Sequence, residues 1–127
     1  MKNTKILLVV LLMNLFLFIS CKKNGAGGRA DISATVIHHD HAIPFSTIHI
    51  KYGAKDFPGT NTSNYDNYIQ TDKNGHADLI NLRYGDYYLY GTGYDSTIMA
   101  PISGGDHLQI KWSERKKTIS FTVPVTE

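Results

Sequence analysis

The chain has 127 residues, of which 42% are hydrophobic and 19% are charged. This balance is typical of one small globular domain, and it excludes a disordered tail, a collagen-like repeat and a protein with many membrane spans. Of the 13 basic residues, Lys2 and Lys5 belong to an N-terminal leader, which leaves 11 basic against 11 acidic residues in the remainder. A nearly neutral chain without a basic stripe argues against nucleic-acid binding.

The first 20 residues have the pattern of a signal peptide. Lys2 and Lys5 precede an almost unbroken apolar run over residues 6–19, which is too short to span a bilayer comfortably as a helix. The run ends in Phe18-Ile19-Ser20-Cys21, which resembles the lipobox of bacterial lipoproteins. This resemblance implies cleavage before Cys21, the only cysteine of the chain, and lipidation of its sulfur by a group that carries acyl chains such as palmitate.

Residues 21–30 are predicted to be the lipidated cysteine and a flexible tether, because residues 22–29 are polar and rich in glycine. The domain then occupies residues 31–127. A lysine at position 22, where enteric lipoproteins retained at the inner membrane have aspartate, favours the periplasmic face of an outer membrane. A plain secretory signal or an uncleaved anchor is the alternative, and both also place the domain outside the cytoplasm.

From Asp31 onward, apolar and polar side chains alternate with a period of two, and turn residues recur every eight to twelve positions. No stretch shows the spacing of an amphipathic helix, so the domain is predicted to be all-β. Seven strands of this length suit a two-sheet sandwich around one core. The predicted strands cover residues 31–38, 45–52, 68–71, 76–79, 87–90, 107–112 and 118–125.

Two segments between these strands have distinct turn chemistry. Residues 54–67 form a long polar loop, and its length predicts a crossover between the two sheets. Asp72-Lys73-Asn74-Gly75 predicts a hairpin turn, because asparagine and glycine adopt positive φ at low cost. The strand over residues 107–112 is expected to carry Leu108, Ile110 and Trp112 on one face.

A family resemblance is carried by residues 68–90, whose Thr-Asp-Lys-Asn-Gly turn, Leu82, Gly85 and Tyr-Tyr-Leu-Tyr strand resemble a signature of prealbumin-like sandwiches. Residues 42–48, with their central proline, resemble the start of the second strand in the same domains. These domains include the carboxypeptidase regulatory-like (transthyretin-like) and Cna-B-type families. The resemblance implies a seven-stranded Greek-key β-sandwich that acts as a binding or structural module without catalysis or a cofactor of its own.

The cluster His38-His39-Asp40-His41 contains three imidazoles and a carboxylate in four residues. Such groups are good ligands for zinc, copper or nickel, so a metal-binding envelope protein is the alternative function. In a strand, successive side chains point to opposite faces, so a site requires the turn to bring alternate members together. A polar surface loop is the competing interpretation.

The aromatic strand around Tyr87, Tyr88 and Tyr90, followed by Tyr94, is the first candidate for a partner-binding surface. Because three of these tyrosines occupy neighbouring positions, some rings must face outward, where they would contact an envelope protein or a glycan. The alternative is that both faces of this strand are covered.

Signals for catalysis are weak throughout the chain. Ser103, Asp106 and His107 lie close in sequence, but a nucleophile and its base must converge in space, and adjacency does not provide that. We therefore expect a lipid-anchored, non-enzymatic protein of the cell envelope, whose partners are the membrane, through its N-terminal lipid, and an envelope protein or glycan.

Overall fold

The computed structural model describes residues 3–6, 9 and 22–127. Cys21 and most of the predicted signal peptide lie outside these residues, so cleavage and lipidation remain predictions. In the described part of the chain, no helix is long and apolar enough to cross a membrane.

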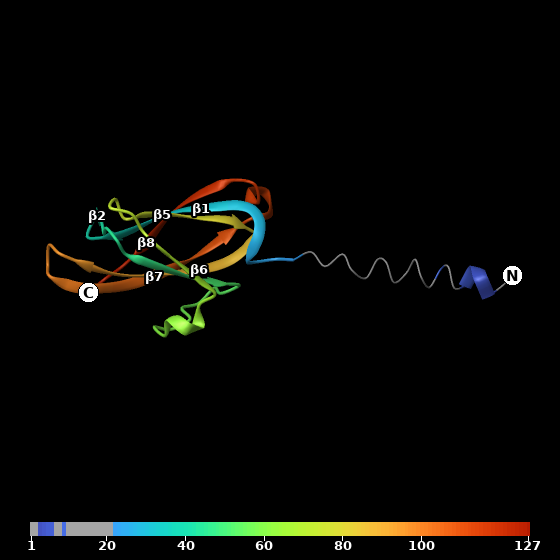
Figure 1. Cartoon of the computed structure of the whole chain (residues 1–127), viewed down its shortest axis with the longest axis horizontal. Coiled ribbons are helices and arrows are strands. Elements are labelled where there is room, and N and C mark those ends of the chain that lie inside the picture. Colours follow the sequence, from blue (N-terminus) through green and yellow to red (C-terminus); the bar gives the residue numbers. More distant parts are fainter. Residues whose placement is uncertain (1–2, 7–8, 10–21) are drawn as a thin grey trace.

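Two four-stranded sheets form the domain and face each other in a sandwich (Figure 1). The first sheet contains β1 (Ala26–His38), β2 (His41–Ala42), β5 (His76–Leu82) and β8 (Thr118–Pro124). The second sheet has the order β4 (Asn67–Gln70), β3 (Thr47–Tyr52), β6 (Gly85–Asp95) and β7 (Ala100–Ile110). The prediction of an all-β sandwich is confirmed.

Strand β1 organises the first sheet, because it pairs antiparallel with β2 and β5 and parallel with β8. All neighbouring strands of the second sheet are antiparallel. The described residues contain eight strands, β1 to β8, instead of the predicted seven. The additional strand is β2, whose two residues are too few to produce an alternating pattern in the sequence.

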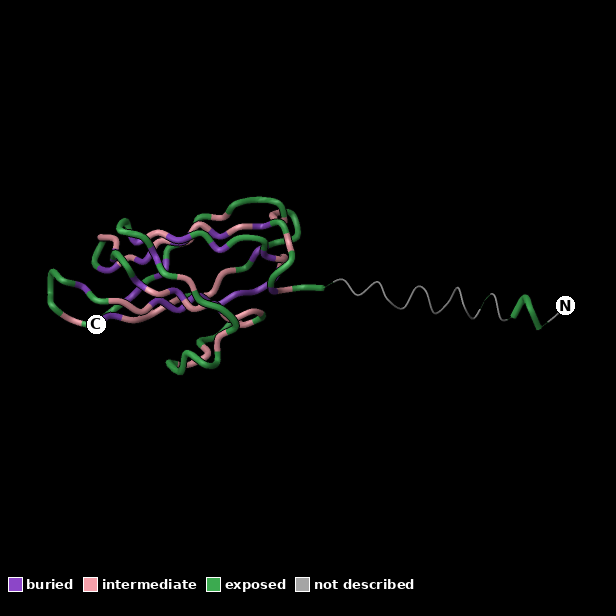
Figure 2. The backbone as a smooth tube through the Cα atoms, in the orientation of Figure 1, coloured by how far each residue is buried: buried purple, intermediate pink, exposed green. Residues whose placement is uncertain are grey.

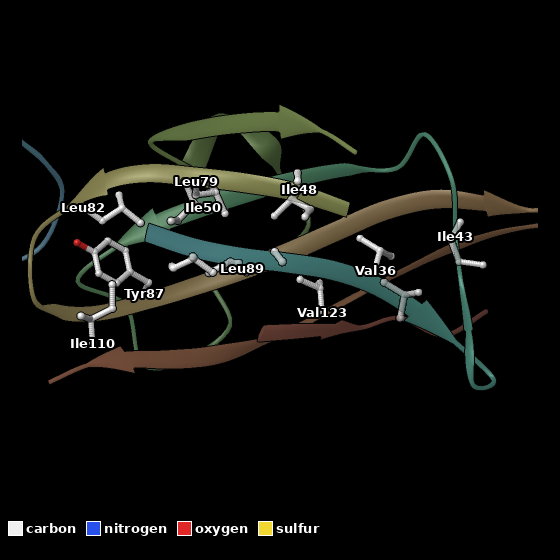
Figure 3. Packing of buried hydrophobic residues seen from close by; sticks show 14 of the residues in the cluster. Val36, Ile43, Ile48, Ile50, Leu79, Leu82, Tyr87, Leu89, Ile110 and Val123 are labelled. Carbon is white, nitrogen blue, oxygen red and sulfur yellow. The ribbon is translucent and has the colours of Figure 1, made fainter. Parts of the chain in front are cut away.

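The core lies between the sheets and is built by alternate side chains of the facing strands, as the period of two predicts (Figures 2 and 3). Full burial of each large aliphatic side chain stabilises the fold by roughly 1.5–3 kcal/mol. The largest fully buried hydrophobic side chains are Ile32, Val36, Ile43, Ile48, Ile50, Tyr87, Leu89, Ile110 and Val123.

The connections differ from two sequence expectations. The long loop before β4 joins β3 to β4, which are neighbours in one sheet, so it is not a crossover between sheets. The turn over residues 72–75 is tight, with Gly75 at φ +72° and its N–H donating to Asp72 O at 3.0 Å. However, it joins β4 to β5, which belong to different sheets, so it is not a hairpin. Turn residues specify a reversal of the chain, and the sheet that each flanking strand joins is decided by packing.

The N-terminal part of the domain begins earlier than predicted. Strand β1 starts at Ala26, within the segment predicted to be a tether, and its register against β5 shifts between Ala26 and Ala30. Gly27, at φ +97°, lies in this bulge, where a residue with a side chain would be strained. The glycines that suggested flexibility therefore allow a bulged strand to pair.

The end of β7 also differs from the prediction. This strand stops at Ile110, and Trp112 lies in the short 3-10 helix η3 (Trp112–Glu114) that follows. Ile110 is buried as expected, but Trp112 is 56% exposed and does not share its face. The tryptophan instead lines a groove on the surface.

Candidate functional site

The histidine cluster is positioned by the hairpin between β1 and β2. His39 and Asp40 form the turn with φ values of +43° and +66°, and His38 pairs directly with His41. Side chains of directly paired residues project from the same face of a sheet. The turn therefore brings the imidazoles of His38 and His41 together, with ring centroids 6.1 Å apart.

A carboxylate from the other sheet completes this cluster. Asp95, at the end of β6, lies with Oδ2 at 2.7 Å from His38 Nδ1 and at 3.0 Å from His41 Nε2. Its other oxygen, Oδ1, accepts hydrogen bonds from the Thr97 hydroxyl at 2.6 Å and the Thr97 backbone N–H at 2.8 Å. These hydrogen bonds, chiefly from the Thr97 hydroxyl and then from His38, hold the pKa of the Asp95 carboxyl well below its usual range.

The remaining nitrogen of His38 faces Glu127. Both His38 and Asp95 are 2% exposed, and His38 Nε2 lies 2.9 Å from Glu127 Oε2 without the alignment of a hydrogen bond. The same carboxylate oxygen is 3.5 Å from Nε2 of His39, whose side chain is 66% exposed. His38, His41 and Asp95 present three donor atoms that lie within 4.8 Å of one another, and so do His38, His39 and Glu127. Imidazole and carboxylate groups at this spacing could hold a metal ion.

The structure thus brings together three of the four residues that the sequence suggested for metal binding, the histidines. His38 and His41 converge on Asp95, whereas the His39 ring lies 4.0 Å from that of His38 and close to Glu127. Asp40 is exposed in the turn. Sequence reasoning missed Asp95, which is 57 residues from His38. The only local signal for it is an aspartate two residues before a threonine in a turn, which is a common side-chain cap and has no specific link to a site.

The tyrosines proposed for partner binding divide between the two faces of β6. Tyr87 points into the core and is fully buried. Tyr88 and Tyr90 lie on the outer face, yet they are only 9% and 5% exposed, because side chains of the β3–β4 loop cover them. Tyr94 is 53% exposed at the far end of the strand, so the structure does not join these four residues into one surface.

The cover over Tyr88 and Tyr90 is itself aromatic. Tyr65 stacks on Tyr90 with centroids 5.6 Å apart, and Phe57 lies 5.4 Å from Tyr90 and 5.7 Å from Tyr88. Burial, with smaller contributions from Tyr88 and Tyr90, raises the pKa of Tyr65 to about 12. Phe57 and Tyr68 remain 52% and 70% exposed, so the outward aromatic surface belongs to the loop and β4.

At the end of the sandwich opposite the histidine cluster, near the start of β1, a groove of about 570 Å³ is lined by basic and aromatic residues. Trp112 packs edge-on against Tyr84 with centroids 4.9 Å apart, and the Arg115 guanidinium lies 4.1 Å from the centre of the Trp112 ring. None of the lining residues is acidic. The basic residues that line the groove are Lys22, Arg29, Arg83, Arg115 and Lys116.

The serine and histidine considered for catalysis do not converge. Ser103 and His107 lie four positions apart on the extended strand β7, a separation of roughly 13 Å. His107 instead contacts Asp86 of the neighbouring strand, with Nε2 3.0 Å from Oδ1.

No family model matches the chain, and the search of curated proteins finds no match. Among solved structures, the chain resembles a crystal structure of a variant of BcpA, the major pilin subunit of Bacillus cereus, with a TM-score of 0.50 and 16% identity. This match covers 79% of the chain and 30% of the pilin, so the chain spans less than a third of that protein's length. A second BcpA structure matches with a TM-score of 0.48 and 16% identity over 82% of the chain and 30% of the pilin. The first likeness is consistent with the predicted prealbumin-like β domain.

Proposed function

We propose that this protein is a non-catalytic, lipid-anchored structural or binding module of the cell envelope, with the groove at the start of β1 facing the membrane. The observation that carries this proposal is the convergence of five basic side chains, without an acidic one, at the end of the domain where the N-terminal segment enters. Lys22 lines this groove and directly follows the predicted lipidation site, Cys21. An acyl chain on Cys21 would therefore hold the groove next to phosphate headgroups.

The contacts of the N-terminal segment support this orientation. Asn24 N–H donates to Tyr84 O at 2.9 Å, and Arg83 N–H donates to Gly25 O at 2.8 Å. Only Lys22 and Lys23 separate these docked residues from Cys21. Because two residues span at most roughly 7 Å, the domain would stand against the membrane surface and not at the end of a long tether.

The basic groove has a chemistry suited to that surface. Each basic side chain near an anionic membrane contributes about 1 kcal/mol of attraction, and tryptophan favours the interface between lipid and water. The acyl chains on Cys21 would provide the anchor, and the basic patch would add electrostatic attraction that orients the domain on an anionic surface. The fold supports a structural role, since BcpA, which it resembles, is described as a major pilin subunit.

Trp112, the only tryptophan, is an internal reporter for this proposal. In vesicles containing acylated protein, brominated lipids should quench Trp112, and the quenching should be stronger with anionic than with zwitterionic lipids. The R83Q/K116Q variant should lose this difference, whereas the matched K55Q/K73Q variant should keep it. If all three proteins showed the same difference in quenching between anionic and zwitterionic lipids, the membrane-facing orientation would be contradicted.

Anchoring is tested separately by labelling cells with an alkyne fatty acid. The wild-type protein should incorporate the label and the C21S variant should not. An unlabelled wild-type protein would overturn the lipid anchor, while leaving the preference of the groove for anionic groups measurable by itself.

The partner-facing surface of the module is the aromatic area formed by Phe57, Tyr65 and Tyr68. Exposed aromatic rings over a rigid sheet are suited to a protein or a glycan, because they bury much area at low entropic cost. Crosslinking of the tagged protein in cells, followed by mass spectrometry, should recover a stoichiometric partner. Recovery of none above background would remove the binding role and leave the structural one.

A further inference from the structure

We propose that His38, His41 and Asp95 form a binding site for a borderline divalent metal ion such as Zn²⁺, Cu²⁺ or Ni²⁺. The ligand atoms are His38 Nδ1, His41 Nε2 and Asp95 Oδ2, from the two sheets of the sandwich. This site is at the end of the domain remote from the basic groove, and the proposal does not depend on lipid anchoring.

The distances from Asp95 to the two imidazoles are close to those of a tetrahedral site, and the two imidazole nitrogens lie within 4.8 Å of each other. Asp95 Oδ2 is 2.7 Å from His38 Nδ1 and 3.0 Å from His41 Nε2. In a tetrahedral site with metal–ligand bonds of about 2.0–2.1 Å, neighbouring ligand atoms are roughly 3.3 Å apart. Outward shifts of a few tenths of an ångström would therefore admit an ion. The His41 side chain is 41% exposed, which leaves an open side for ion entry and for water as a fourth ligand.

The contacts around the three ligands favour the protonation states that metal binding needs. His41 Nδ1 lies 3.3 Å from His39 O, so a proton on Nδ1 leaves the lone pair of Nε2 directed towards Asp95. Thr97 donates two hydrogen bonds to Oδ1 of Asp95, which leaves Oδ2 as the single ligating oxygen. Hydrogen bonds of this kind orient the ligands of known metal centres.

The buried nitrogen of His38 provides an independent indication. Within the part of the chain that the structure describes, His38 Nε2 is buried and has no hydrogen-bond partner, although Glu127 Oε2 is only 2.9 Å away. When Nδ1 holds a metal, the proton of a neutral imidazole is on Nε2, where a small rotation of Glu127 would let it donate to the carboxylate. The result is a carboxylate–histidine–metal arrangement, in which the outer carboxylate increases the basicity of the ligating ring.

A proton can take the place of the metal in this arrangement. A doubly protonated His38 between Asp95 and Glu127 would also satisfy both contacts, as an ion-pair cluster without an ion. Among the described residues, His76 with Asp78 and His107 with Asp86 form two other histidine–aspartate pairs, each with a 3.0 Å contact and without a third ligand. They provide matched controls, because removal of either histidine breaks a pair without touching the proposed site.

The test is a titration of the purified full-length protein, stripped of metal with a chelator, with Zn²⁺ by calorimetry and with Co²⁺ by its visible absorption. We expect one saturable site per chain and an intense tetrahedral cobalt spectrum. H41A should weaken binding by at least roughly a hundredfold, and E127Q, which alters only the outer carboxylate, by roughly tenfold. H107A should bind as the wild type does.

Because H41A changes a half-exposed side chain, its folding can be verified by circular dichroism before the titration. A wild-type protein that shows no saturable one-to-one site would overturn the proposal and support the protonated ion-pair cluster. Equal affinities of H41A and H107A would also overturn it. As a second readout, Zn²⁺ should raise the unfolding temperature of the wild type and of H107A, and should leave that of H41A unchanged.

Discussion

The Tyr87 hydroxyl accepts a hydrogen bond from the backbone N–H of Gly25 at 2.8 Å and donates one to Arg83 O at 2.6 Å, within a buried site. Gly25 precedes Tyr87 by 62 residues, so one side chain joins the N-terminal segment to the corner before β6. The aromatic ring lies in the core, and its hydroxyl satisfies backbone groups that would otherwise be buried without partners.

Removal of this hydroxyl is expected to destabilise the domain. Y87F should lower the free energy of unfolding by about 1–3 kcal/mol, since the Gly25 N–H loses its partner while the ring still fills the core. Urea unfolding followed by circular dichroism measures this effect. Y94F, which removes a hydroxyl from an exposed ring, should unfold as the wild type does. Equal midpoints for the two variants would contradict the role assigned to Tyr87.

The same residue predicts a loss of stability in alkaline solution. Burial raises the pKa of Tyr87 from 10.0 to about 12, so the folded state favours the neutral hydroxyl. The stability that neutral Tyr87 contributes is fully present below the pKa of tyrosine in the unfolded chain, near 10. It is lost as the pH rises from about 10 towards 12. The urea midpoint of the wild type should fall more steeply than that of Y87F between about pH 10 and pH 12. Parallel curves would refute the prediction.

The assignment of inner and outer faces is tested by two substitutions of similar size. Leu89 is fully buried between the sheets, whereas Ile80, on the outer face of β5, is 61% exposed. L89A should lower the free energy of unfolding by about 2–5 kcal/mol because it leaves a cavity. I80A should change it by no more than about 0.5 kcal/mol. A large effect of I80A would mean that this face is covered in solution.

The turn between β1 and β2 contains a substitution expected to stabilise the protein. Asp40 has φ +66°, which is a strained conformation for a residue with a side chain. D40G should relieve strain of roughly 1 kcal/mol and raise the unfolding temperature. Since Asp40 is not among the proposed metal ligands, Zn²⁺ affinity should not change. Weaker Zn²⁺ binding by D40G would instead indicate that Asp40 is one of the metal ligands.

The aromatic cover on the second sheet is tested by F57A. Loss of this half-exposed ring should uncover Tyr88 and Tyr90 and loosen the loop, so limited proteolysis between β3 and β4 should become faster. Any partner crosslinked through this surface should be recovered in lower yield. I98A, which removes an exposed side chain from the β6–β7 turn, should change neither result. Unchanged proteolysis of F57A would show that the ring does not hold the loop.

Alternation in the sequence determined the fold class and much of the core. Ile32, Ala34 and Val36 are buried, in agreement with the alternation from Asp31 onward, because a strand with one buried face must place apolar side chains at every second position. The tight turn at Asp72–Gly75 could also be predicted, since turn chemistry is local. The sheet that each strand joins could not be predicted, because a four-residue turn has the same sequence requirements whether it connects strands of one sheet or of two.

The candidate metal site shows the same division. The cluster over residues 38–41 could be recognised in the sequence, but strand alternation favoured His39 with His41, or His38 with Asp40. The hairpin instead pairs His38 with His41. The packing of the two sheets places Asp95 between His38 and His41, leaves Asp40 outside the proposed site and covers the outer tyrosines. Local patterns reflect which side of a strand is buried, whereas contacts over more than 50 residues depend on how the two sheets pack.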